Sequence, residues 1–388
     1  MNELINKRNP SGINRLLIHG LYISALLYNI HRYIFKYNSS ATSPTYTNTP
    51  NAWKAGKYLI ILLVLSFFYM NKRAYKIHQP VRELIIHSFL LWSLVVNVIW
   101  ILDFGTPVWE ELEYLLWGIA LLPVFYLGDD LKEFITDFLS RNFSVIAYFT
   151  IVTDFFVIAN YHLTGRLTAL SYEGSLIRFG GLWDDPNGFG LFCNFLVYIA
   201  LDKRKWLMAA LLAICVFYTV SFSAYLIFFI VILLWGLKGF RINNYFLYFS
   251  LAAGTGICLI FALYWPDIYA FYVTTVQQKQ GSIDSHTSVK LEFLLFPYLN
   301  KKFFFHETWY ISYLYNYSPF SYLFLFLILC FVIYLFSKPY KAYTEIYLLL
   351  FMLEMIFIPM LSVFPLNMLF FLFLYSTYGI RYKKKEGG

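Results

Sequence analysis

The stretch 178–190 combines an arginine, two carboxylates and a Pro-Asn-Gly turn, in the order Arg-Phe-Gly-Gly-Leu-Trp-Asp-Asp-Pro-Asn-Gly-Phe-Gly. Its glycines and its proline disfavour a helix, and its charges are costly in hydrocarbon. The stretch must therefore cap a membrane bundle or line a wet cavity within one. Because the fork of an arginine binds phosphate oxygens in pairs and stays charged, these residues indicate a site for a phosphate-bearing or sugar-bearing ligand.

The composition of the whole chain indicates a polytopic membrane protein. Of its 388 residues, 60% are hydrophobic and 13% are charged, whereas about a quarter are charged in an ordinary soluble domain. The net charge of +8 is spread over short connections between apolar segments, so we expect no nucleic-acid partner. The cysteines have neither the spacing of a disulfide framework nor that of a metal site, and we expect no metal and no cofactor. They lie in apolar segments, at Cys193, Cys215, Cys258 and Cys330.

The predicted fold is all-α: one integral membrane domain over residues 1–388, with about twelve transmembrane helices. The apolar segments that carry this prediction are 14–35, 56–71, 84–104, 114–128, 142–162, 188–202, 206–222, 224–240, 243–264, 319–337, 343–361 and 364–380. With both termini cytoplasmic, about two-thirds of the 30 Lys and Arg residues fall on the inner side, as the positive-inside rule requires. Polar residues interrupt the segment 14–35, which is also compatible with a helix on the membrane surface.

Two outer connections are long, at about 163–187 and 265–318, and long loops on one face of a bundle usually carry function. The first holds Arg166 and the stretch 178–190. A third outer segment, the Ser/Thr/Asn/Pro-rich linker at 38–51, is expected to be flexible coil.

The residues of the two long loops resemble the O-antigen polymerase and O-antigen ligase superfamily. The first similar pattern follows an outer loop and opens a spanning segment: Arg178-x-x-Gly181-x-x-x-x-Pro186-Asn187-x-Phe189-Gly190. In the larger loop, 285–293 and Glu307-x-x-Tyr310-Ile311-x-x-Leu314 are similar to the segments that open and close the functional part of the family's periplasmic loop. The resemblance in order and topology covers most of the chain from about residue 140 onward.

The chain also departs from the family pattern. Lys290 stands where an arginine is usual, and Ser221-Phe222-Ser223 stands where the family often has Ser-Arg. Ligases usually have a histidine at the position aligned with Glu307, which favours a polymerase, although His306 precedes it directly.

The resemblance implies a GT-C-like, metal-independent, inverting glycosyltransferase in a bacterial inner (cytoplasmic) membrane, with its site facing the periplasm or exterior. Such an enzyme joins undecaprenyl-pyrophosphate-linked oligosaccharide repeat units into O-antigen or capsular and exopolysaccharide chains. Membrane lipid surrounds it, and a polysaccharide chain-length regulator is a further candidate partner. The alternatives are an O-antigen ligase, which passes finished glycan to another acceptor, and a transporter or flippase for the lipid-linked oligosaccharide.

The reaction needs cations at the phosphates, because negative charge develops on the departing pyrophosphate. Arg178, Arg166 and Lys290 are the candidates for that role. The acceptor hydroxyl needs a hydrogen-bond acceptor or base, for which Glu307, His306 and His286 are candidates. We assign Arg178, Glu307 and His306 as catalytic. The predicted substrate-binding residues are Arg166, Lys290, His286, Asp185, Asn187 and Tyr310.

Each candidate also has a plainer explanation. Arg178 would pair with Asp184 or Glu173, and Asp185 or Asn187 would cap the helix that begins near Gly188. The two histidines and Glu307 would be solvated loop residues.

Two carboxyl groups and one amphipathic segment complete the expectations. Asp154 and Glu354 lie within predicted spans, where we expect them to pair with polar neighbours rather than to form an ion relay. The segment 129–141 has its apolar residues on one helical face and is expected to lie on the inner leaflet.

Overall fold

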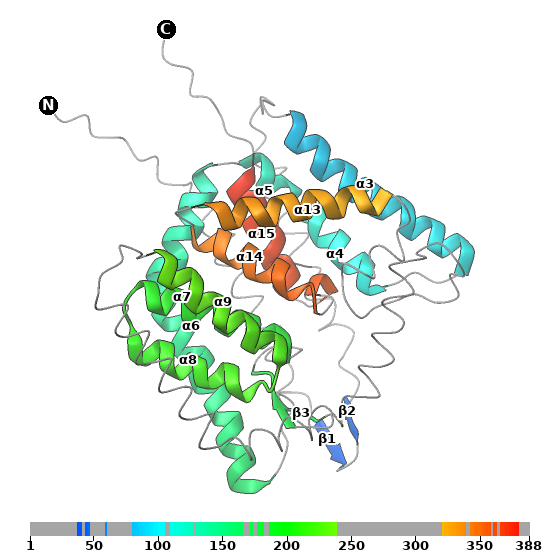
Figure 1. Cartoon of the computed structure of the whole chain (residues 1–388). Coiled ribbons are helices and arrows are strands. Elements are labelled where there is room, and N and C mark those ends of the chain that lie inside the picture. The colour runs from blue at the N-terminus through cyan, green and yellow to red at the C-terminus, as the bar shows by residue number, and fades with distance from the viewer. Residues whose placement is uncertain are drawn as a thin grey trace, which may run out of the picture.

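The computed structural model describes residues 37–40, 43–46, 59, 80–104, 109–127, 129–165, 171–173, 177–181, 186–238, 320–338, 342–357, 360–362 and 365–379. These residues are mostly helical, with two short β-hairpins (Figure 1). The helices are α3 (Pro80–Phe104), α4 (Trp109–Ala120), α5 (Leu122–Leu127), α6 (Asp129–Thr164), α7 (Pro186–Asp202), α8 (Trp206–Tyr218), α9 (Phe222–Lys238), α13 (Phe320–Ser337), α14 (Tyr343–Glu354), the 3-10 helix η1 (Met360–Ser362) and α15 (Leu366–Tyr378).

Each predicted span that falls within the described residues coincides with helix, so the helical prediction is confirmed there. The predicted spans 14–35 and 243–264 lie outside the described residues, as does 56–71 apart from residue 59. The segment 114–128 is divided between α4 and α5 by a turn at Leu121. Pro123, just after this turn, has no backbone N–H with which to continue the hydrogen bonds of α4.

Helix α7 is the centre of the bundle. It contacts α6, α8, α9 and α14, and its residues from Gly188 to Leu201 are buried. A helix that is apolar on nearly all sides, as α7 is, suits a position surrounded by other helices. Its polar residue Asn194 donates a 2.8 Å hydrogen bond to the backbone oxygen of Ala224, which ties α7 to α9.

Helix α6 joins two segments that the sequence analysis treated separately. The segment expected on the inner leaflet, 129–141, is continuous with the span at 142–162, and its Ile135 and Leu139 are buried in the protein core. The expectation of a separate helix on the leaflet was therefore wrong, because the apolar face meets other helices. By length and composition, Ile135–Thr164 is the one helix of the described residues that is long and apolar enough to cross a membrane.

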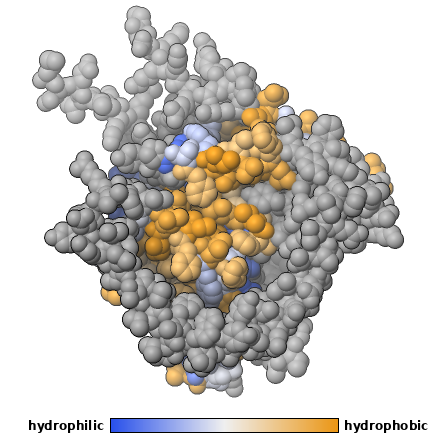
Figure 2. Space-filling view, viewed as in Figure 1, coloured by the Kyte–Doolittle hydropathy of each residue, from blue (hydrophilic) through white to orange (hydrophobic). Residues whose placement is uncertain are grey.

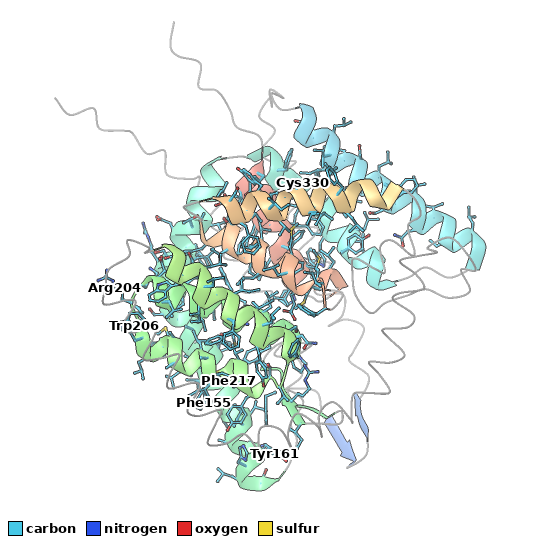
Figure 3. All side chains as sticks on the ribbon, in the orientation of Figure 1. Phe155, Tyr161, Arg204, Trp206, Phe217 and Cys330 are labelled. Carbon is cyan, nitrogen blue, oxygen red and sulfur yellow. The ribbon has the colours of Figure 1, made fainter. Side chains whose placement is uncertain are left out.

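Basic residues gather where α7 ends and α8 begins. Lys203 donates a 2.7 Å hydrogen bond to Ser140 Oγ of α6, and Arg204 has a left-handed backbone with φ of 57°. We call this region, with Lys203, Arg204, Lys205 and Lys338, the basic end. Arg204 and Trp206 lie here, whereas Phe217 lies toward the other end of α8 (Figure 3).

Helix α14 begins at the basic end. The Tyr343 hydroxyl donates a 2.8 Å hydrogen bond to Asp202 Oδ2, and Lys338 Nζ lies 2.6 Å from Glu345 Oε1. Burial lowers the pKa of Lys338, but the hydrogen bonds and charge of Glu345, together with Tyr334, more than offset this, so the pKa lies above its usual value. Since α14 starts beside the end of α7, its last residue, Glu354, comes close to the start of α7.

Large apolar side chains cover much of the outer surface of the helices. On α6 the exposed residues include Val145, Phe149, Val152 and Phe156, and α3, α9 and α13 carry similar faces. In Figure 2 the coloured area at the centre of the view, which belongs to described residues, is largely apolar, with small hydrophilic areas above and below. Exposed apolar side chains that gather on neighbouring helices are typical of surfaces that contact a partner protein or a lipid bilayer.

The two hairpins lie beside each other. Strands β1 (Tyr37–Ser40) and β2 (Ser43–Tyr46) pair antiparallel, as do β3 (Ser171–Glu173) and β4 (Ile177–Phe179). Strand β2 contacts β3, and both hairpins appear at the foot of the molecule in Figure 1. The expectation of flexible coil at 38–51 was thus wrong for the residues of β1 and β2, where tyrosine and threonine favour a strand.

Candidate functional site

Strand β4 presents Arg178 to the start of α7. Its neighbour in the strand, Phe179, is buried against Val157 and Ile158 of α6. The Phe179 ring also meets the rings of Tyr161 and Tyr218 edge-on, at centroid distances of 5.8 and 5.7 Å. Because successive side chains of a strand point to opposite faces, anchoring Phe179 on α6 turns Arg178 the other way.

The guanidinium of Arg178 is held by two neutral oxygen atoms. Nε donates to the backbone oxygen of Thr219 at 3.1 Å, and Nη2 donates to Asn187 Oδ1 at 2.7 Å. Two bonds to separate nitrogens fix the plane of the guanidinium. Neither acceptor is charged, so these contacts orient the cation without neutralising it.

Asn187 belongs to the first turn of α7. The helix begins at Pro186, two residues before the expected start at Gly188, and a proline suits the first helical position because it has no N–H to leave unbonded. The oxygen of Asn187 accepts from Arg178 and also from the hydroxyl of Ser221, at 2.6 Å. Asn187 therefore links β4 to the α8–α9 turn, and the alternative in which it caps the helix is wrong.

The hydrogen bonds continue from Asn187 into the bundle. Ser221 Oγ lies 3.0 Å from Ser223 Oγ, which is in turn hydrogen-bonded to Glu354 Oε1 at the end of α14. Ser221, Ser223 and Glu354 are 2%, 6% and 0% exposed. We call Arg178, Asn187, Ser221, Ser223 and Glu354 the polar chain. It connects four segments: β4, the first turn of α7, the start of α9 and the end of α14.

Two glycines of the stretch 178–190 are explained by close packing. Gly181 has a φ of +53°, and a Cβ there would strike the ring of Phe189. A Cβ at Gly190 would lie 2.5 Å from the Cβ of Ala224 in α9. The first glycine leaves room for the ring of Phe189 in α7, and the second lets α7 and α9 approach closely. Both therefore hold the elements that carry Arg178, Asn187 and Ser221.

No protein-family model, curated protein or solved structure matches the chain. The resemblance of its motifs to the O-antigen polymerase and ligase superfamily therefore stays a prediction.

The structure brings together two of the predicted site residues, Arg178 and Asn187. The others lie outside the described residues, so the predicted convergence of Arg166, Arg178 and Lys290 stays a prediction. The predicted site residues outside the description are Arg166, Asp185, His286, Lys290, His306, Glu307 and Tyr310. Asp184, which offered Arg178 an alternative ion pair, is outside as well.

The sequence analysis missed three residues of the site, Thr219, Ser221 and Ser223. A signal for them was present, because the run Thr-Val-Ser-Phe-Ser interrupts two strongly apolar helices on the side of the bundle where 178–190 was expected. Glu354 was expected to pair with a polar neighbour, and Ser223 is that neighbour.

Asp154 forms a second buried polar position, in α6. Its side chain is 0% exposed and lies beside the thiol of Cys215, with Cys193 nearby. No hydrogen bond of ordinary geometry reaches either carboxylate oxygen within the described residues. In the same part of the chain, no group of three or more His, Cys, Asp or Glu residues is arranged to hold a metal ion.

Proposed function

We propose that this chain is a membrane-embedded glycosyltransferase that joins undecaprenyl-pyrophosphate-linked oligosaccharide repeat units into longer glycan chains. The observation that carries the proposal is the oriented guanidinium of Arg178 beside the first turn of α7. In the reaction, the bond from the anomeric carbon to the pyrophosphate oxygen breaks and a bond to the acceptor hydroxyl oxygen forms. The hydroxyl proton passes to a base, and Arg178 binds the departing diphosphate.

The two hydrogen bonds of Arg178 suit this role. An arginine whose side chain is already fixed loses less conformational entropy when it binds a phosphate. A larger part of the interaction free energy then contributes to binding affinity. Charge-assisted hydrogen bonds from a guanidinium to phosphate oxygens are also stronger than those between neutral groups. The acceptors Thr219 O and Asn187 Oδ1 are neutral groups, and these two contacts provide the orientation of the guanidinium.

The distribution of charge supports a bundle of about twelve spans in a bacterial inner membrane, with the site on the outer face. Lys203, Arg204 and Lys205 lie at the start of α8, and the Thr219 contact to Arg178 lies just beyond its end. The positive-inside rule favours a cytoplasmic basic end, and in the proposed arrangement Arg178 is then on the outer side. The exposed apolar faces of α3, α6, α9 and α13 then meet lipid.

The rest of the proposed site comes from the outer loops. Arg166 and Lys290 would join Arg178 at the diphosphate. Glu307, His306 and His286 are the candidates for the base that receives the hydroxyl proton. Both roles require the loop 265–318 to fold over the end of the bundle that carries Arg178.

The test is elongation by the purified full-length protein in liposomes, supplied with one kind of lipid-linked repeat unit. Arg178→Ala should abolish long products while the protein still folds and inserts into the membrane. Arg178→Lys should retain part of the activity, since lysine keeps the charge but loses the planar fork. The matched control is Arg204→Ala, which removes an exposed arginine at the basic end and should elongate normally.

Normal long products from Arg178→Ala would reject the proposal. A ladder of products from a single donor identifies a polymerase, because a ligase needs a second kind of acceptor. Movement of labelled lipid across the bilayer with no new glycosidic bond would replace the enzyme with a transporter.

A further inference from the structure

We infer that Glu354 is a neutral carboxylic acid that donates the first hydrogen bond of the polar chain and, through it, positions Arg178. The protonation state follows from the hydrogen bonds alone. Its consequence for glycan transfer rests on the proposed function.

The argument begins at Asn187. Its side-chain atom next to Arg178 Nη2, at 2.7 Å, must be the amide oxygen, because an amide NH2 would face another donor. This oxygen can accept but cannot donate. It lies 2.6 Å from Ser221 Oγ, so the single hydroxyl proton of Ser221 must lie between the two atoms.

Ser221 then has lone pairs only for its other neighbours. The backbone N–H of Ala224 donates to Ser221 Oγ at 3.3 Å, and Ser223 Oγ lies 3.0 Å away. The hydrogen bond between the two serines therefore uses the hydroxyl proton of Ser223. That leaves no serine proton for the contact between Ser223 and Glu354, so the carboxyl group must supply it.

Burial leads to the same protonation state. Glu354 is 0% exposed, and its serine partner is 6% exposed. Removing a carboxyl group from water costs much more free energy when the group is ionised than when it is protonated. The proton count and the burial are independent observations.

With Glu354 protonated, the donors run in one direction, from Glu354 to Ser223, Ser221 and Asn187. Arg178 donates to the same Asn187 oxygen from the other side. If Glu354 were ionised, Ser223 would turn its proton to the carboxylate and the bond to Ser221 would be lost. Ser221 and Asn187 would then be held less firmly. Glu354 is thus a positioning residue, which acts on the guanidinium through three side chains.

The first test measures protonation without measuring activity. An infrared difference spectrum, wild type minus Glu354→Gln, should show the carbonyl stretch of a protonated carboxylic acid in the full-length protein in lipid. Asp154 contributes equally to both samples and cancels. Carboxylate bands in place of this stretch would overturn the inference, whatever the protein catalyses.

The second test uses two variants of similar size. In Glu354→Gln, an amide N–H replaces the acid O–H as the donor to Ser223, so elongation should stay close to that of the wild type. Glu354→Met has no donor, and loss of the buried hydrogen bond should lower elongation about tenfold or more. If Gln lowers activity as much as Met, the carboxyl acts as an anion and the inference is wrong.

A control separates positioning from general loss of packing. Thr377→Val removes a buried hydrogen bond of 2.8 Å to Thr344, between α15 and α14, and should not change elongation. Thermal unfolding of each variant shows whether it is folded. The two failures remain distinct: normal elongation by Arg178→Ala rejects the proposed function and leaves the infrared result standing.

Discussion

The guanidinium of Arg178 donates a 2.7 Å hydrogen bond to the side-chain oxygen of Asn187, which joins β4 to the first turn of α7. This contact explains why the glycine-rich stretch 178–190 contains both Arg178 and Asn187. It also makes the orientation of Arg178 depend on α8, α9 and α14, because Asn187 is hydrogen-bonded to Ser221 and, through Ser223, to Glu354.

Asn187→Asp tests whether Arg178 binds an anion. Aspartate keeps an oxygen for Arg178 but adds a negative charge that repels a diphosphate. We expect the affinity for undecaprenyl pyrophosphate to fall about tenfold, ~1.4 kcal/mol, with no loss of thermal stability. The control is Asn160→Asp, which makes the same change on α6 outside the polar chain. Equal losses of affinity in both variants, measured by titration in nanodiscs, would contradict the prediction.

Gly181→Ala should destabilise the site more than Gly165→Ala does. Both glycines have a positive φ, of +53° and +67°, so each alanine costs ~1–2 kcal/mol in backbone strain. At Gly181 the new Cβ also strikes the ring of Phe189, whereas at Gly165 it meets nothing within 4 Å. Overpacking adds ~1–3 kcal/mol at Gly181 alone. Unfolding midpoints of the two variants compare the costs directly, and equal midpoints would show that the ring contact is unimportant.

Gly190→Ala should separate α7 from α9, and Ala224→Gly should restore their contact. The added Cβ would lie 2.5 Å from that of Ala224, and relief by helix movement should cost ~1–3 kcal/mol. Ala224→Gly alone costs ~0.5–1 kcal/mol, because glycine is unfavourable within a helix. The double variant should be more stable than Gly190→Ala. A double-mutant cycle of unfolding free energies checks this, and additive effects would rule out a direct contact.

Two engineered cysteines test the direction of the bundle. Gly165 follows α6 near the tyrosine rings that hold β4, and Arg204 is exposed at the basic end. With Cys258 and Cys330 replaced by serine, a membrane-impermeant thiol reagent should label Gly165→Cys in intact cells. It should label Arg204→Cys only after the membrane is opened. Labelling of both from the same side would contradict a membrane-spanning arrangement of α8.

The sequence was sufficient for the helices. Apolar runs of limited length and the residues between them predicted where most of the described helices lie, because a helix forms from contacts within one short segment. The predicted segment 343–361 is longer than α14, which ends at Glu354. The division at Leu121 and the continuity of α6 through 129–164 were not predicted. Both depend on whether a helix continues or stops at a point where the sequence signal for a helix end is weak. In addition, the apolar face of 129–141 has the same pattern whether it contacts lipid or protein.

The sequence by itself also determined that 178–190 is the candidate site. An arginine, glycines and a proline destabilise an apolar helix, so their presence in this chain indicates a role that apolar residues cannot fill. Only the tertiary structure decided that Arg178 meets Asn187 and Thr219, and that Ser221, Ser223 and Glu354 extend the same chain of hydrogen bonds. Periodicity shows which face of a helix is apolar, but it does not show which helix ends meet. The hydrogen-bond partners within the polar chain therefore depend on how α7 packs against α9 and α14.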